Sequence, residues 1–451
     1  MQSTIGEARS APSMSLCEGQ GPPIPGPRTP AWIQTAQFLG RPEVFLERNR
    51  DRYGDVFRAR IYGFGTGRAV FLADPEMIKE VFRGSSSALR LGEIAGIAVT
   101  PVAGPDSLLS LDGAKHLAHR KLVLPPFHGE RMRAYEGIMA EAADRSLADW
   151  PMHTPLPMRP RFGDITMEVM MRAIFGVERG ERREQLGEAV TRLIELDNLS
   201  ERLALVFPRL RRDFGPLRHW STFERQRARA DALIYDEIRQ RRQADDLAER
   251  EDILSMLLAT PLSDSEIHDE LITMMIAGHE TTATALAWAF DLLLHHPRVL
   301  DRLREELRAG DESYLEAVVH ESLRIRPVVA TSQRVVMEPV EIGGYHFEPG
   351  TTIFSAIWLV HRRDDLYPPD PLEFRPERFL GTRPQTYEWI PFGGGVRRCI
   401  GANFAPMEMR VVLARMLTQA EFEPADQELE RPQNKVVLLA PRNGTMAIRR
   451  A

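Results

Sequence analysis

Cys399 is the residue with the clearest chemical surroundings in this sequence. Three glycines and two arginines precede it in the segment Phe392-Gly393-Gly394-Gly395-Val396-Arg397-Arg398-Cys399-Ile400-Gly401. A helix is predicted to begin directly after the thiol and to run to about Gln419. Positive charge and a helix N-terminus both favour a thiolate. The segment therefore predicts a thiol with a lowered pKa, acting as a nucleophile or as a metal ligand.

The second of these roles fits the sequence better. A nucleophilic cysteine needs a base such as histidine, oriented by a third group. The nearest histidine in sequence is His361, and no nucleophile signature accompanies it. A single thiolate can hold haem iron as the axial ligand without a second protein ligand. A buried, inert cysteine would leave the glycines and arginines unexplained, so the residues alone favour a thiolate that acts as a metal ligand, with a nucleophile as the open alternative.

Glu280 and Thr281 form an acid–alcohol pair inside a long apolar segment at 271–294. The polar residues of this segment favour a buried core helix over a membrane span, and a capping box, Ser263-x-x-Glu266, marks its start. A threonine in mid-helix can bond back to a carbonyl or distort the helix. Gly278 would weaken the backbone ladder nearby, so a groove is expected here. Taken alone, the segment fits an ordinary amphipathic helix equally well.

Two pairs of polar residues have helical spacing. His116 and Arg120 are four residues apart and can reach one anion, and Glu321 and Arg324 lie three apart on one helix face. Each pair alone is weak evidence, because exposed pairs of this kind are common. The glycines at 63–67 lack the third glycine of a dinucleotide-binding motif and precede a strand, so they predict a hairpin turn.

The elements that must position the candidate functional residues are mostly helices, as the helical periodicity of the sequence indicates. Asp74-Pro75 caps one helix, and Asp112 is predicted to cap another at 113–124. Strand patterns occur at 56–72 and 332–356, and an irregular stretch covers 362–398. Further helices are predicted at 130–150, 164–176, 182–198, 218–243, 263–296, 299–308 and 312–325. The fold class is therefore mainly α with a small β portion, with one domain at 22–451 after a disordered tail at 1–21.

Composition excludes several classes of protein. Cys17 and Cys399 are the only two cysteines, which excludes a disulfide scaffold and four-cysteine zinc or iron–sulfur sites. So few cysteines also fit a reducing cytosol. A net charge of −6 argues against nucleic-acid binding. With neither a signal-peptide core nor a membrane span in the sequence, we expect a cytoplasmic protein without stable membrane insertion.

Taken together, these motifs resemble the cytochrome P450 family of haem-thiolate monooxygenases. Phe392-x-x-Gly395-x-Arg397-x-Cys399-x-Gly401 is similar to the family's haem-binding loop at every fixed position. Ala277-Gly278-His279-Glu280-Thr281-Thr282 resembles its oxygen-activating segment, and Pro376-Glu377-Arg378-Phe379 resembles the segment that joins the Glu-x-x-Arg helix. The resemblance runs from residue 22 to the end. It indicates a soluble bacterial-type member, or one from which an N-terminal anchor has been removed.

The resemblance implies a role for each of these residues. Cys399 is the axial ligand of haem b, Thr281 stabilises bound O2, which is the co-substrate, and Glu280 helps to relay protons. Glu321, Arg324 and Arg378 form a structural triad. Propionate contacts are implied for His116, Arg120, Arg334 and Arg397, and further cofactor binding for Ala277, Phe392, Gly395 and Gly401. The implied cytochrome P450 fold has a long central helix that crosses the haem.

Substrate recognition is implied for aliphatic and small residues at the family's distal-pocket positions. They predict a bulky apolar substrate such as a terpenoid, a steroid or a fatty acid. Apolar residues at these places are also what any protein core would show. Together with Ala277, the residues are Ile94, Ile97, Val99, Leu108, Met274, Val328, Val329, Ala330, Thr331, Leu438 and Leu439.

The implied reaction inserts one oxygen atom of O2 into a C–H bond, and its electrons must come from separate proteins. We expect a ferredoxin with an NAD(P)H-dependent reductase, or a flavodoxin-type donor, serving a monomeric enzyme. Lys121, Arg398 and Arg410 lie where the family presents a basic docking face, although a charged surface without a partner would look the same. Two alternatives stay open. One is a peroxide-driven peroxygenase, a class that typically lacks the acid–alcohol pair, and the other is a non-catalytic haem-thiolate sensor or electron carrier.

Overall fold

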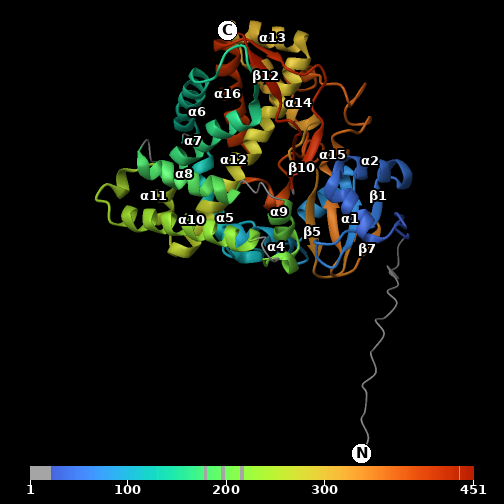
Figure 1. Ribbon diagram of the computed structural model, residues 1–451. Coiled ribbons are helices and arrows are strands. Elements are labelled where there is room, and N and C mark those ends of the chain that lie inside the picture. Colours follow the sequence, from blue (N-terminus) through green and yellow to red (C-terminus); the bar gives the residue numbers. More distant parts are fainter. Residues whose placement is uncertain are drawn as a thin grey trace, which may run out of the picture.

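The computed structural model of the protein describes residues 22–129, 131–176, 180–194, 199–213, 218–435 and 437–450. The predicted tail at 1–21, with Cys17, lies outside these residues. The architecture is mainly α with a small β portion, which confirms the predicted fold class. In Figure 1 most helices gather on one side and the largest sheet lies on the other, with the long helix α12 (Asp264–His295) between them.

Helices from the whole chain surround α12. Those before it are α1 (Ala31–Gly40), α2 (Pro42–Tyr53), α3 (Pro75–Arg83), α4 (Gly92–Ala103), α5 (Gly113–Val123), α6 (Arg131–Ala148), α7 (Met158–Phe175), α8 (Glu181–Ile194), α9 (Leu199–Val206), α10 (His219–Arg242) and α11 (Ile253–Leu258). Those after it are α13 (Pro297–Arg308), α14 (Ser313–Ile325), α15 (Ile357–Val360) and α16 (Phe404–Gln419). Short 3-10 turns are η1 (Pro125–Phe127), η2 (Pro208–Leu210), η3 (Leu247–Glu249), η4 (Pro376–Phe379), η5 (Gly395–Arg397) and η6 (Ile400–Ala402).

The largest sheet has the strand order β1-β2-β8-β5-β3. β1 (Val56–Arg60) and β2 (Arg68–Leu72) form the predicted hairpin. β2 pairs in parallel with β8 (Thr352–Ser355), which pairs antiparallel with β5 (Ser332–Val336), and β5 pairs antiparallel with β3 (Leu89–Arg90). Three smaller sheets complete the β portion. One pairs β6 (Val340–Ile342) with β7 (Tyr345–Phe347), and another pairs β10 (Pro432–Lys435) with β11 (Leu438–Pro441). The third has the order β4 (Pro155–Pro157), β12 (Met446–Arg449) and β9 (Phe422–Pro424).

α12 begins at the predicted capping box. The Ser263 hydroxyl accepts the Glu266 N–H, and the Glu266 carboxylate accepts the Ser263 N–H at 3.0 Å. Most of α12 is buried in an apolar core that also contains residues of α6, α7, α14 and α16. The apolar segment at 271–294 is therefore a core helix, as predicted. Within the described residues, no helix is both long enough and apolar enough to cross a lipid bilayer.

One predicted helix cap and two predicted helix starts are wrong. Asp112 precedes α5 but does not cap it, because its carboxylate accepts the N–H groups of Leu91 (3.2 Å) and Glu93 (3.1 Å) at the start of α4. The last helix begins at Phe404 instead of directly after Cys399, since η6 intervenes. α7 begins at Met158 rather than at 164, immediately after a short strand.

Helices α1, α2, α4, α9, α11 and α15 have no counterpart among the predicted elements. α4 contains Gly96 and Pro101, residues that weaken a helical pattern. α9 has eight residues and α11 has six, so neither completes enough turns to show a clear period. Their helical form depends on packing in the folded protein, which a local pattern does not contain.

Candidate functional site

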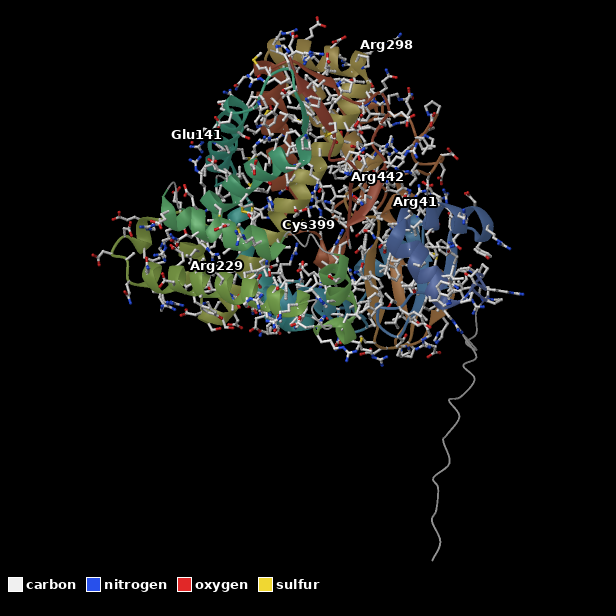
Figure 2. The ribbon with its side chains drawn as sticks, viewed as in Figure 1. Arg41, Glu141, Arg229, Arg298, Cys399 and Arg442 are labelled. Atoms are coloured by element: carbon white, nitrogen blue, oxygen red, sulfur yellow. The ribbon has the colours of Figure 1, made fainter. Side chains whose placement is uncertain are left out.

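Cys399 lies in a tight loop that joins η5 to η6. Its backbone N–H donates to the carbonyl of Phe392 at 3.0 Å, which closes the loop on itself. Gly395 has a φ of 64°, and a Cβ there would lie 1.8 Å from the carbonyl oxygen of Phe82 on α3. Only glycine fits that position. The loop holds the Cys399 side chain accessible to solvent, and Figure 2 shows this residue in the middle of the molecule.

The protein that surrounds the sulfur raises the pKa of the Cys399 thiol, although solvent reaches the side chain, so the predicted lowering is wrong. The Gly401 N–H and the charges of Arg120 and Arg398 act in the opposite direction but do not outweigh the surrounding protein. α16 begins only at Phe404, which keeps its N-terminus away from the sulfur. A metal ion bound to the sulfur would stabilise the thiolate form.

Four basic side chains gather beside this loop. His116 and Arg120 come from α5, Arg334 from β5 and Arg397 from η5. His116 is buried, and burial together with the charges of Arg397, Arg120 and Arg334 lowers its pKa to about 3. Burial and the charge of Arg397 lower the pKa of Arg334 to about 10. The structure thus brings all four predicted propionate contacts into one cluster.

The basic cluster carries more positive than negative charge. Asp112 pairs with Arg397 and is the carboxylate that acts on both Arg334 and Arg397. One carboxylate beside three guanidinium groups leaves a positive charge that an anion would neutralise. The two propionates of haem b are such anions, since guanidinium groups bind carboxylates well. The donor set, an accessible thiol with a basic cluster beside it, therefore fits haem b.

Two of these arginines also fix the loop to its neighbours. Arg120 donates to the carbonyl of Arg398 at 2.7 Å, which links α5 to the residue before the thiol. Arg397 donates to the carbonyl of Leu108 at 3.0 Å and to that of Leu111. The segment before α5 is thereby tied to the Cys399 loop, and Leu108 lies at that junction.

Ala277 and Thr281 mark an accessible face on the otherwise buried α12. Ala277 is exposed and Thr281, one turn later, is half-buried. Thr281 Oγ1 donates to the Ala277 carbonyl at 2.5 Å, the back-bond that the sequence predicts. The backbone of α12 is not interrupted at Gly278, where the sequence predicts a weaker hydrogen-bond ladder, because the helix continues through it. A Cβ at Gly278 would lie 2.5 Å from Met170 Sδ, so this glycine allows α7 to pack closely.

The carboxylate of Glu280 is held by Arg159 at the start of α7. Arg159 Nε also donates to Thr284 Oγ1 at 3.2 Å, so one guanidinium spans two residues that are one turn apart on α12. The backbone N–H of Arg159 donates to Gly444 at 2.9 Å. Sequence reasoning missed Arg159, because no local spacing connects it with a glutamate far along the chain.

Glu321, Arg324 and Arg378 meet as the resemblance implies. Glu321 and Arg324 on α14 are fully buried and share two hydrogen bonds, of 2.6 and 2.7 Å. Arg378 Nε of η4 lies 3.5 Å from Glu321. Arg324 also donates to the carbonyls of His361 (2.6 Å) and Pro371 (2.7 Å). The triad therefore pins the irregular stretch at 362–398 to α14.

His361 has a structural place that the sequence did not indicate. It is fully buried, and burial and the charges of Arg324 and Arg362 hold its pKa well below the usual value. In the neutral ring Nδ1–H donates to the Arg324 carbonyl at 3.1 Å, while Nε2 accepts the Ile390 N–H at 2.9 Å. His361 thus joins α14 to the chain that leads into the Cys399 loop. Both ring nitrogens are occupied, so it is not a base for a nucleophilic cysteine.

The predicted pocket residues fall into three groups. Leu108, Met274 and Val328 belong to the core around α12, with Val99 and Leu438 packed at its edge. Ala330 and Leu439 belong to the core beside the large sheet, and the Leu439 N–H bonds to Val328 at 2.7 Å, which connects the two groups. Ile94, Ile97, Val329 and Thr331 lie outside both cores. Ile97, Val329 and Thr331 are half-buried.

Comparison with known proteins agrees with this geometry. The sequence profile of the family described as Cytochrome P450 matches residues 21–448. The chain belongs to the cytochrome P450 family. It is 41% identical over 436 residues to the protein designated cytochrome P450 137 of Mycobacterium tuberculosis, covering 94% of this chain and 90% of that protein. It is 39% identical over 443 residues to cytochrome P450 135B1 of Mycobacterium bovis, covering 96% and 92%.

A solved structure shows the same fold. The cyanobacterial protein CYP120A1, solved with retinoic acid bound, superposes on this P450 with a TM-score of 0.81 at 23% identity, covering 95% of this chain and 99% of that one. P450 proteins are generally haem monooxygenases with a haem-thiolate cofactor. The thiol and the basic cluster found here are residues suited to hold that cofactor.

Proposed function

We propose that this P450 inserts one oxygen atom of O2 into a C–H bond of a bulky hydrophobic molecule, with electrons delivered by separate redox proteins. The observation that carries the proposal is the pairing of the accessible Cys399 thiol with a basic cluster that lacks negative charge. Cys399 would bind the haem iron, and His116, Arg120, Arg334 and Arg397 would hold the propionates. Haem iron with a thiolate ligand supplies the oxygen-activating chemistry.

The residues of α12 would handle protons in this reaction. Thr281 Oγ1 donates its own proton to Ala277, so its lone pairs stay available to accept a hydrogen bond from water. Glu280 is held by Arg159 and must leave that partner to carry a proton toward Thr281.

The substrate class follows from the side chains placed around α4, α12 and β11. They are aliphatic or small, and several are half-buried, which suits an apolar molecule more than a charged one. The CYP120A1 neighbour holds retinoic acid, and a ligand of comparable apolar character is our expectation here. A terpenoid, a steroid or a fatty acid would fit this description.

A panel of apolar compounds is first screened for binding by the shift of the Soret band. The proposal predicts that a compound that binds is oxidised when a ferredoxin and an NAD(P)H-dependent reductase supply electrons. In Thr281→Ala, NAD(P)H is still consumed, but the product formed per NAD(P)H falls at least about tenfold, because the hydroxyl that accepts a hydrogen bond from water is missing. Thr281→Ser keeps a hydroxyl and should retain most of the yield. Turnover with peroxide alone would indicate a peroxygenase, and the absence of any Soret shift would indicate a sensor or electron carrier.

A basic face behind the Cys399 loop is the proposed docking site of an acidic ferredoxin. A hollow of ≈ 690 Å³ lies there, and Arg398, Arg410 and Arg383 are among its lining residues. Lys121 is exposed on α5, next to Arg120, which bonds to Arg398. Charges of this kind mainly speed the encounter of two proteins and act most strongly at low salt.

Charge reversal at this face tests the docking site. Lys121→Glu combined with Arg410→Glu should lower the rate of electron transfer from ferredoxin about tenfold at low salt, with a smaller effect at high salt. Arg229→Glu reverses one cation on α10, where Arg229 is exposed and away from this face, and should leave the rate unchanged. Equal rates for all three proteins at low salt would show that the basic residues are only a charged surface.

A further inference from the structure

Pro101 inside helix α4 and Pro105 just beyond its end leave two carbonyls of the helix without helical partners. In a regular helix the carbonyl of Ile97 accepts from residue 101 and that of Pro101 accepts from residue 105. Both positions are proline, and proline has no N–H. Ile97 and Pro101 lie four residues apart, so the two carbonyls occupy one face of the helix. That face needs donors from elsewhere in the fold.

An arginine from a neighbouring segment supplies each donor. Arg211, directly after η2, donates to the Ile97 carbonyl. The same guanidinium donates to the carbonyls of Ala204 (3.1 Å) and Leu205 (3.0 Å) on α9, so it bridges α9 and α4. Arg227 on α10 donates to the Pro101 carbonyl at 2.6 Å. Hydrogen bonds from a charged donor are stronger than those between neutral groups.

The C-terminal end of α4 is fixed separately to α12. Asp269 accepts the Asp106 N–H at 2.9 Å, and a Cβ at Gly104 would lie 2.1 Å from the same carboxylate. Gly104 has a φ of 87°, so the chain turns sharply there. Asp269 therefore anchors the chain after α4, and Asp112 anchors the first turn of α4. The two arginines hold the face of the helix between these anchors.

We propose that Arg211 and Arg227 form a latch that holds α4 closed over the pocket and sets how fast bulky apolar molecules enter and leave. α4 carries Ile94, Ile97 and Val99, and it contacts α9, α12 and β5. Release of the two carbonyls would let the middle of α4 move between the anchors at Asp112 and Asp269. The inference rests on the proposed function only in placing the pocket beneath α4.

The latch is tested on the haem-loaded enzyme with Arg211→Gln and Arg227→Gln, alone and combined. Amide hydrogen exchange at 92–104 should become about tenfold faster in each single variant, as expected for the loss of one charge-assisted hydrogen bond. Binding and release of clotrimazole, a bulky azole, followed by the Soret shift, should accelerate by a similar factor. Binding of imidazole, which is small, should change little. Arg225→Gln is the matched control, since Arg225 on α10 bonds only locally, to Thr222.

A rescue distinguishes the latch from a general loss of stability. Pro101→Ala restores an N–H that can bond to the Ile97 carbonyl inside α4. In that background Arg211→Gln should change exchange and clotrimazole rates less than twofold, whereas Arg227→Gln keeps its full effect. Unchanged exchange at 92–104 in the combined variant, or no rescue by Pro101→Ala, would overturn the proposal. If clotrimazole gives no Soret shift in the unaltered protein, the proposed haem function fails, and hydrogen exchange still decides on the latch.

Discussion

Replacement of Cys399 by serine is expected to abolish the red-shifted Soret band in the carbon monoxide difference spectrum of the reduced protein, together with all measurable monooxygenase turnover. Serine keeps the size of the side chain but does not supply a thiolate to iron. Within the described residues Cys399 is the only cysteine, and its nearest histidine in sequence, His361, has both ring nitrogens engaged. Neither another described cysteine nor His361 can therefore replace Cys399 as the axial ligand.

The same substitution should leave the protein fold intact. The Cys399 side chain is accessible and belongs to none of the apolar cores. The unfolding free energies of the two apoproteins should agree within about 0.5 kcal/mol. Cys17→Ser, at the other cysteine of the chain, is the matched control and should keep both the spectrum and the activity. A Cys399→Ser protein that keeps the red-shifted band would show that another residue binds the iron.

The sequence was sufficient to find Cys399 because the residues of its loop are consecutive. Close approach to Phe82 requires Gly395, and the resulting glycine pattern is visible without a structure. It was not sufficient to predict the state of the thiol. Charge and a nearby helix predicted a lowered pKa, but burial depends on segments far away in the chain and outweighs both. The pKa of this thiol is set by all of the protein around it, which local motifs do not contain.

Long-range partners explain the other differences. Glu280 was predicted as a functional acid, but its partner Arg159 comes from α7 and shares no local motif with it. Asp112 has the sequence position of a helix cap, yet its carboxylate binds α4 and Arg397 instead. By contrast, the capping box at Ser263 and Glu266 was predicted correctly, because both of its groups lie within one turn. Local hydrogen bonds can be predicted from spacing, whereas contacts between elements require the fold.

Replacement of Arg324 by methionine is expected to prevent stable folding and haem incorporation, although Arg324 lies outside the basic cluster beside Cys399. Methionine fills a similar volume but leaves the fully buried Glu321 without its bidentate partner. Removal of one member of a buried ion pair costs roughly 3–5 kcal/mol. The carbonyls of His361 and Pro371 also lose a charged donor. This loss is a large part of a typical domain stability of about 5–15 kcal/mol.

Comparison with an exposed pair separates the cost of burial from the removal of a charge. Arg192→Met breaks the pair with Glu188 on the surface of α8 and should change the unfolding free energy by less than about 1 kcal/mol, measured by urea unfolding. Glu321→Gln combined with Arg324→Met removes both buried charges and should recover part of the loss, because no uncompensated carboxylate remains. If Arg324→Met is as stable as Arg192→Met, the triad does not hold the 362–398 stretch. If the double variant is no better than Arg324→Met, the cost comes from the freed carbonyls and not from the charge of Glu321.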